Sequence, residues 1–222
     1  MTSQPANVPR KGPVVTEVYH LIFGMLISQE IPPGARMAVD EIARKLGVSQ
    51  TPVRQALATL EAEGLVTRTH LVGYRAGELM TRRQFDDLFA VRAFLEPQAA
   101  RLAAEKPAPE RLAEMRSTQS EMTYEASRNG VVPYGTFARH DAELHSAIAE
   151  ASRNEALRDA VSRLNAHVHL FRLYVDRAVT HDALDEHEEI VSAIEHRDPR
   201  RAAAAMRAHL RRSQKRLRSA FE

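Results

Sequence analysis

The spacing of apolar residues changes near residue 80, and this change constrains the fold more than any other feature of the sequence. Before it, proline and glycine repeatedly interrupt the apolar stretches. Beyond Leu79, Ala, Leu, Glu and Arg dominate, and apolar residues recur at helical spacing to the end of the chain. We therefore expect a mainly α protein with a flexible polar leader at residues 1–13 and two domains, at residues 14–79 and 80–222.

The first domain has the pattern of a helix-turn-helix followed by a β-ribbon. An apolar stripe over residues 14–30, which includes Leu21, indicates a first helix. Asp40 is placed to cap a second helix that ends at Gly47, and Ser49 is placed to cap a third. Two strands are expected at residues 65–69 and 74–76. The ribbon has the size of a wing that lies against the DNA backbone.

The start of the third helix carries the polar side chains with which a helix-turn-helix reads DNA. Ser49 and Thr51 can donate hydroxyl groups to phosphates or bases, Arg54 can bind guanine or a phosphate, and Gln50 suits adenine. The alternative is an ordinary packing module with a polar edge. Charge does not decide between them, because residues 1–80 carry eight Lys and Arg against seven Asp and Glu, a balance of +1.

The stretch IPPGARMAVDEIARKLGVSQTPVRQALATLEAEGLVTRTHLVGYRAG, residues 31–77, resembles the GntR-type winged helix-turn-helix. Its PG turn, the segment LGVSQTPVRQAL and the LEAEGLV lead into the wing carry the resemblance. There is one departure, since the family usually has Arg where this chain has Gln50. The resemblance implies sequence-specific binding to double-stranded DNA. The contacts it implies are Ser49, Gln50, Thr51 and Arg54 in the recognition helix and His70 and Gly73 in the wing.

In the second domain, breaks in the pattern define six expected helices, for which an antiparallel bundle is the economical packing. Asp141 and His145 lie four apart on an otherwise apolar face, and His187 and His209 lie on the apolar faces of two other helices. A buried carboxylate is costly unless a cation or strong donors compensate it. The pattern predicts a divalent metal site, with Zn²⁺ as the first candidate and Mn²⁺, Ni²⁺ or Fe²⁺ as alternatives. For each histidine, the alternative is an ordinary hydrogen bond in the core.

The region from Phe85 to the C-terminus resembles the FCD effector-binding domain of FadR-type GntR regulators, and the expected six helices indicate its VanR-like subgroup. The opening FDDLFAVRAFLEPQAARLAA, the D-x3-H segment and the later DEHEEIVSAIEHRDPRRAAAAMRAHL carry the resemblance. It implies that a small organic or sugar acid completes the coordination of a metal. The metal ligands it implies are Asp141, His145, His187 and His209.

The same resemblance implies an arginine clamp for the acid, and Arg92 stands at the matching position. The alternative for Arg92 is a salt bridge to Glu96, one helical turn away. The resemblance also implies a homodimer that binds a palindromic operator. The remaining histidines, His167 among them, are expected to have surface or structural roles.

These patterns together predict a transcription regulator and not an enzyme, and the family resemblance implies a repressor. A metal-dependent hydrolase with an appended winged helix is the alternative from another class, because the same side chains could activate a water. A further alternative is a regulator whose metal is itself the signal or is purely structural. The chain has no Cys, and no apolar run approaches the ~20 residues that span a bilayer. We therefore expect a cytoplasmic protein without a membrane partner.

Overall fold

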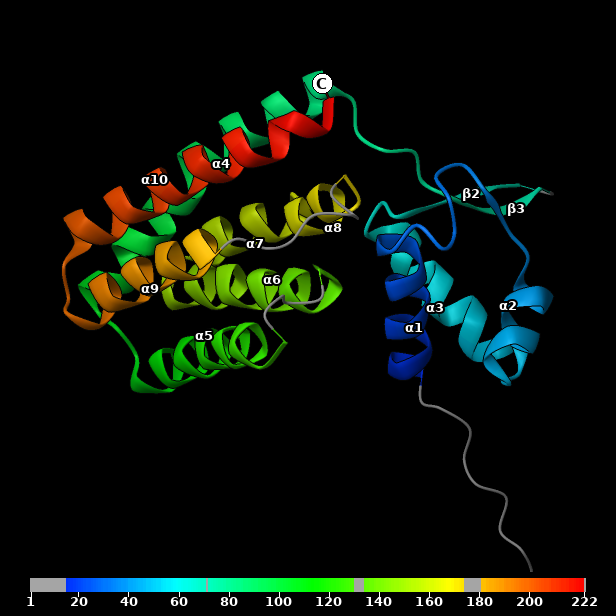
Figure 1. Ribbon diagram of the computed structural model, residues 1–222, viewed down its shortest axis with the longest axis horizontal. Helices are drawn as coiled ribbons and strands as arrows, with labels where there is room; N and C mark the ends of the chain where they lie inside the picture. Colours follow the sequence, from blue (N-terminus) through cyan, green and yellow to red (C-terminus); the bar gives the residue numbers. More distant parts are fainter. Residues whose placement is uncertain (1–14, 71, 130–133, 174–180, 222) are drawn as a thin grey trace, which may run out of the picture. The chain divides into compact units, whose positions relative to one another are not determined.

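The computed structural model describes residues 15–70, 72–129, 134–173 and 181–221, so the leader expected at residues 1–13 lies outside the described residues. The chain divides into two compact units between Glu78 and Leu79 (Figure 1). Each unit is described below by itself.

The first unit contains three helices and a three-stranded antiparallel sheet in the order β1-β3-β2. Its elements are α1 (Val15–Ile27), β1 (Arg36–Met37), α2 (Val39–Leu46), α3 (Gln50–Ala62), β2 (Val66–Thr69) and β3 (Gly73–Ala76). The expected ribbon is the pair β2 and β3, in which Arg68 faces Tyr74. Strand β1 was not expected, because two residues are too few to show the alternation by which a strand is recognised.

Helix α1 packs against α3 and closes the core of this unit. Ile22 and Leu26 of α1 and Leu57 of α3 are completely buried. Leu21, which we expected on the inner face, is 45 % exposed, because the buried stripe follows Val18, Ile22 and Leu26 at a spacing of four. The prediction for Leu21 was therefore wrong.

The caps of the two short helices differ in part from the expectation. The N-cap of α2 is Ala38, and Asp40 instead lies in the first turn, where its carboxylate interacts favourably with the helix dipole. Gly47 ends α2 in the left-handed conformation, with φ of 67°. Ser49 is the N-cap of α3, as expected, although its side chain makes no capping hydrogen bond. The two helices thus meet across a short turn, as a helix-turn-helix requires.

The second unit is helical throughout the part of the chain that the structure describes. Its helices are α4 (Arg82–Glu105), α5 (Pro109–Asn129), α6 (Tyr134–Ala151), α7 (Glu155–Arg163), α8 (Ala166–Phe171), α9 (His181–Glu195) and α10 (Pro199–Arg218), followed by the 3-10 turn η1 (Ser219–Phe221). Helices α4 and α10 run side by side, and α9 packs against both (Figure 1). Helix α5 packs against α9 and α6, and α6 also packs against α4.

The segment that was expected to form one helix after residue 154 is divided into α7 and α8. The division has a local cause, because Asn165 adopts φ of 43°, a left-handed conformation that Asn tolerates better than most residues. Helix α8 therefore begins as a separate helix at Ala166. As a result the described residues form seven helices between Arg82 and Arg218, where six were expected.

Candidate functional site

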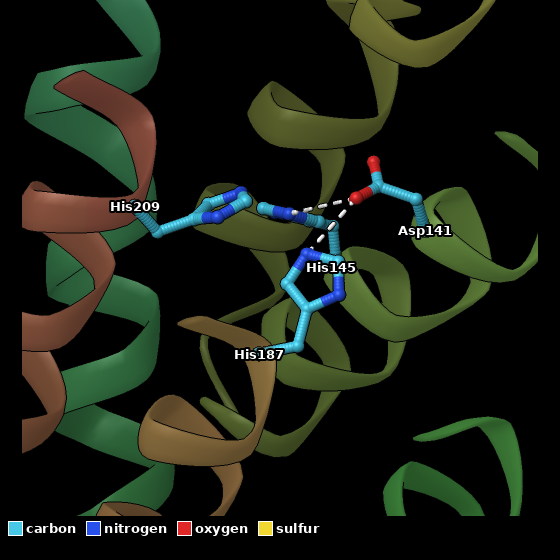
Figure 2. Close-up of side chains that lie close together, drawn as sticks. All are labelled: Asp141, His145, His187 and His209. Atoms are coloured by element: carbon cyan, nitrogen blue, oxygen red, sulfur yellow. Dashed lines mark ion pairs between the residues drawn. The ribbon is translucent and has the colours of Figure 1, made fainter. Parts of the chain in front are cut away.

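Four titratable side chains from three helices converge inside the second unit (Figure 2). Asp141 and His145 come from α6, His187 from α9 and His209 from α10. Each of the four is buried, and each offers one ligand atom that lies within 4.8 Å of the others. The structure thus brings together the four residues that the sequence analysis singled out.

The distances around the Asp141 carboxylate show how these atoms are arranged. His187 Nε2 lies 3.0 Å from Asp141 Oδ1, and His145 Nε2 lies 3.9 Å from the same oxygen. Although His187 Nε2 lies this close to Asp141 Oδ1, neither of these Nε2 atoms, nor His187 Nδ1, meets the geometry of a hydrogen bond with any described residue, and all three are buried. Buried polar atoms without partners cost free energy and are uncommon in folded proteins. A cation bound between the Nε2 atoms and Oδ1 would remove this cost, so the residues fit a metal ion.

Two buried glutamates each contact one histidine of the cluster and determine which ring nitrogen faces the other cluster residues. Glu96 Oε2 lies 2.7 Å from His145 Nδ1, and Glu186 Oε2 lies 2.9 Å from His209 Nδ1. A histidine that donates its Nδ1–H to a carboxylate keeps the lone pair of Nε2 for a metal. His145 and His209 are therefore held in the tautomer and orientation of metal ligands.

Each of these glutamates is in turn held by an arginine. Arg92 donates to both oxygens of Glu96, with a distance of 3.2 Å from Nη2 to Oε2, and both side chains are almost fully buried. Arg216 donates to both oxygens of Glu186, at 2.7 and 2.9 Å. Arg92 thus forms the salt bridge to Glu96 that the spacing of four predicted, and it supports His145 through Glu96. Its role as an effector clamp stays a prediction.

A fifth side chain, His167, also belongs to this cluster. His167 Nδ1 lies 2.9 Å from Asp141 Oδ2, on the oxygen that does not face His187. Sequence reasoning assigned His167 a surface or structural role, because a single continuous helix gave no reason to direct it inward. The signal that could have found it is Asn165, since a residue that readily adopts positive φ ends α7 and starts α8.

The electrostatics of the cluster favour the protonation states of metal ligands. Burial by itself would raise the pKa of Asp141, but the electrostatic interaction with His145 and the hydrogen bond from His167 hold the pKa well below its usual range. Burial lowers the pKa of His209 to about 3, although the hydrogen bond to Glu186 opposes this shift. The carboxylate is therefore ionised and the imidazole neutral near pH 7, and both can coordinate a metal without first losing a proton.

The residues predicted to contact DNA all lie on the surface of the first unit. The exposed set is Ser49, Gln50, Thr51 and Arg54 at the start of α3 and His70 and Gly73 at the turn between β2 and β3. Arg54 Nη2 donates to Gln50 Oε1 at 3.1 Å, so these two side chains are coupled. Gly73 has φ of 98°, a value that favours glycine at the turn. The polar start of α3 is thus open to solvent.

Both units match known protein families. Residues 15–76 match the family described as "Bacterial regulatory proteins, gntR family", and residues 87–212 match the family described as "FCD domain". The "Nta operon transcriptional regulator" of Aminobacter aminovorans is 31 % identical over 186 residues, which cover 84 % of this chain and 86 % of that protein. The "Probable D-xylose utilization operon transcriptional repressor" of Paenarthrobacter nicotinovorans is 30 % identical over 198 residues, covering 89 % of this chain and 85 % of that protein.

Solved structures show the same fold. E. coli McbR/YncC has a TM-score of 0.75 and 19 % identity, covering 96 % of this chain and all of that one. A GntR transcriptional regulator from Rhodococcus sp. RHA1 has a TM-score of 0.69 and 20 % identity, covering 94 % of this chain and 99 % of that one.

A winged helix-turn-helix with an exposed polar recognition helix, joined in one chain to an all-helical unit with a buried ligand cluster, defines a DNA-binding transcription regulator. The relatives are named as regulators and not as enzymes, which decides against the hydrolase alternative. The chain belongs to the GntR family of bacterial regulatory proteins and carries an FCD domain. None of the helices in the described part of the chain is long and apolar enough to cross a membrane.

Proposed function

We propose that this regulator is a repressor whose affinity for its operator is controlled by a small carboxylic acid bound at a buried divalent metal. The observation that carries the proposal is the convergence of three imidazoles and one carboxylate, in which the buried Nε2 atoms of His145 and His187 form no hydrogen bond within the described part of the chain. The proposed metal ligands are Asp141, His145, His187 and His209. When bound, the ion supplies a positive charge that attracts the acid's carboxylate.

The coordination number of the metal bears on whether the ion takes part in binding the acid or only stabilises the fold of the second unit. Four protein ligands complete a tetrahedral site, which is the usual arrangement for structural Zn²⁺. A six-coordinate ion such as Mn²⁺, Ni²⁺ or Fe²⁺ would keep positions for an acid. An effector that completes the coordination therefore favours a six-coordinate ion, whereas Zn²⁺ would favour the structural role. Metal analysis of the purified protein separates these two cases.

The repressor assignment rests on the winged helix and on the printed name of one relative, which is called a transcriptional repressor. A repressor that blocks a promoter needs a specific operator, and Ser49, Gln50, Thr51 and Arg54 are the proposed readers, with His70 and Gly73 in the wing. A homodimer would present two recognition helices to a palindrome. The exposed apolar side chains of α4, Val91 at 42 % and Phe94 at 79 %, are consistent with a protein partner on that helix.

The test is a titration of DNA with metal-loaded and metal-free protein, using a palindrome from the region upstream of the protein's own gene. We expect specific binding that a panel of small carboxylic and sugar acids weakens only when the metal is present. If a chelator unfolds the second unit, the metal is structural. Binding that depends only on salt and not on DNA sequence would refute the regulatory proposal.

A further inference from the structure

A cavity of about 170 Å³ lies among α6, α7 and α8 of the second unit, and His167 is one of the residues that line it. The same His167 side chain donates through Nδ1 to Asp141 Oδ2 at 2.9 Å. Its ring centre lies 5.0 Å from the ring centre of His145. One side chain therefore separates this cavity from two of the proposed metal ligands.

Among the side chains of the cluster, His167 is also the most accessible to solvent. It is 17 % exposed, compared with 11 % for Asp141 and 1 % for His145. His187 and His209 are 0 % and 4 % exposed. The cluster is therefore shielded on the sides of α9 and α10 and is least covered on the side of His167. A solute that moves from the cavity toward the proposed metal ligands would have to pass the imidazole of His167.

The chemistry of the cavity wall favours an anion. The wall combines the hydroxyl and amide groups of Ser146, Ser162 and Asn165 with the guanidinium group of Arg158, which also donates to Asp159 at 2.7 and 2.9 Å. None of the described residues that line the cavity carries a carboxylate. A larger groove of about 640 Å³ lies between α9 and α10, and its lining combines four carboxylates with three basic side chains: Asp182, Asp185, Glu186, Glu189, Arg212, Lys215 and Arg216. Because the carboxylates outnumber the basic groups by one, the smaller cavity is the better match for an anionic ligand.

We propose that the cavity among α6, α7 and α8 is the pocket where a small organic anion binds on its way to the metal, with His167 as the residue shared by pocket and metal centre. This inference rests on the metal-dependent function proposed above. The volume lies below the ~300 Å³ at which pockets for drug-sized molecules begin, so the pocket suits a metabolite of a few carbon atoms. Its polar groups would bind the anion while His167 moves aside.

Access can be measured without knowing the natural acid, by loading the protein with Co²⁺ and following azide binding through the visible absorption of the metal. Ser146 is exposed at the cavity wall on α6, so Ser146→Phe can fill the cavity without disturbing the core. We expect this variant to bind azide at least ~10-fold more slowly or more weakly, with unchanged Co²⁺ content and thermal midpoint. Ser117→Phe, at an exposed serine of α5 that does not line the cavity, is the matched control.

A second variant tests the charge of the wall. Arg158→Gln removes the guanidinium group, and we expect a several-fold loss of azide affinity that disappears at high salt. If Ser146→Phe and Arg158→Gln both bind azide as the wild type does, the cavity does not serve the metal. A wild-type protein that fails to hold one Co²⁺ per chain, or whose Co²⁺ absorption ignores azide, would instead overturn the proposed metal-dependent function, and this inference with it.

Discussion

His187 Nε2 lies 3.0 Å from Asp141 Oδ1, which joins a fully buried imidazole of α9 to a carboxylate of α6. Removing a carboxylate from water costs several kcal/mol unless a positive charge or strong donors compensate it. His167 compensates the other oxygen of Asp141. A divalent cation beside Oδ1 would compensate the charge on that oxygen, and the imidazole nitrogens could coordinate the same cation.

The first prediction concerns the metal itself. Asp141→Asn keeps the shape of the side chain but removes its charge, so we expect metal affinity to fall by at least ~100-fold, beyond the effect of losing a partner outside the ligand set. Metal content after dialysis and calorimetric titration measure this effect. His196→Gln, at an exposed histidine of α9's C-terminal end, is the control and should bind metal as the wild type does. Full metal content in Asp141→Asn would contradict the assignment.

The second prediction concerns the buried pair Arg92 and Glu96. Arg92→Met leaves the Glu96 carboxylate buried without its main partner, which should cost about 3–5 kcal/mol of unfolding free energy. Adding Glu96→Gln should restore most of this loss, because the amide is neutral and its oxygen can still accept from His145 Nδ1. Urea unfolding of the metal-free proteins gives both values.

The same helix supplies the control for this experiment. Arg101 and Glu105 have the same spacing on α4, but their side chains are 40 % and 42 % exposed. Arg101→Met should therefore cost less than ~1 kcal/mol. Equal losses for Arg92→Met and Arg101→Met would show that the buried pair has no special role.

The third prediction is the pH dependence of the metal-free protein. Because the pKa of His209 is lowered from 6.5 to about 3 on folding, the unfolded chain binds one more proton between these values. Stability is therefore complete above pH 6.5 and falls as the pH decreases toward 3, by at most ~1.4 kcal/mol per pH unit for this group. Thermal unfolding from pH 7.5 to 4.5 measures the slope, which should be smaller in His209→Gln and unchanged in His196→Gln. A flat profile for the wild type would rule this account out.

The fourth prediction concerns DNA. Arg54→Ala should weaken binding to the operator by about 1–3 kcal/mol, which is roughly 5- to 150-fold, if Arg54 contacts a base. Anisotropy titrations at a fixed salt concentration measure the loss. Arg200, an exposed arginine of α10, provides the control variant Arg200→Ala, which should bind as the wild type does. A uniform loss on operator and random DNA would instead place Arg54 on a phosphate.

The fifth prediction uses the position at which this chain departs from its family. Gln50 accepts a hydrogen bond from Arg54, and an arginine at position 50 would repel it. We expect Gln50→Arg to release the side chain of Arg54 and to change the preferred base at one operator position, which selection from a randomised operator would reveal. An unchanged preference would show that position 50 does not read the sequence.

Sequence reasoning predicted most of the first unit because its signals are local. The turn at Gly47, the cap at Ser49 and the strands on either side of residue 71 depend on neighbours in the chain. The helical periodicity around Asp141, His145, His187 and His209 likewise showed that each of these side chains faces inward. The prediction failed at Leu21 because Leu21 and Ile22 are both apolar, and the packing of α1 against α3 determines which of the two is buried.

The amino-acid sequence alone therefore determined the fold class, the helix-turn-helix and the inward orientation of three histidines and one aspartate, since periodicity and capping act within a few residues. Only the tertiary structure decided that Arg92 holds Glu96, that Glu96 and Glu186 orient His145 and His209, and that His167 reaches Asp141. These contacts join helices that are distant in the chain, and they form only because α4, α6, α8, α9 and α10 pack at one particular set of distances and rotations, which no local pattern encodes.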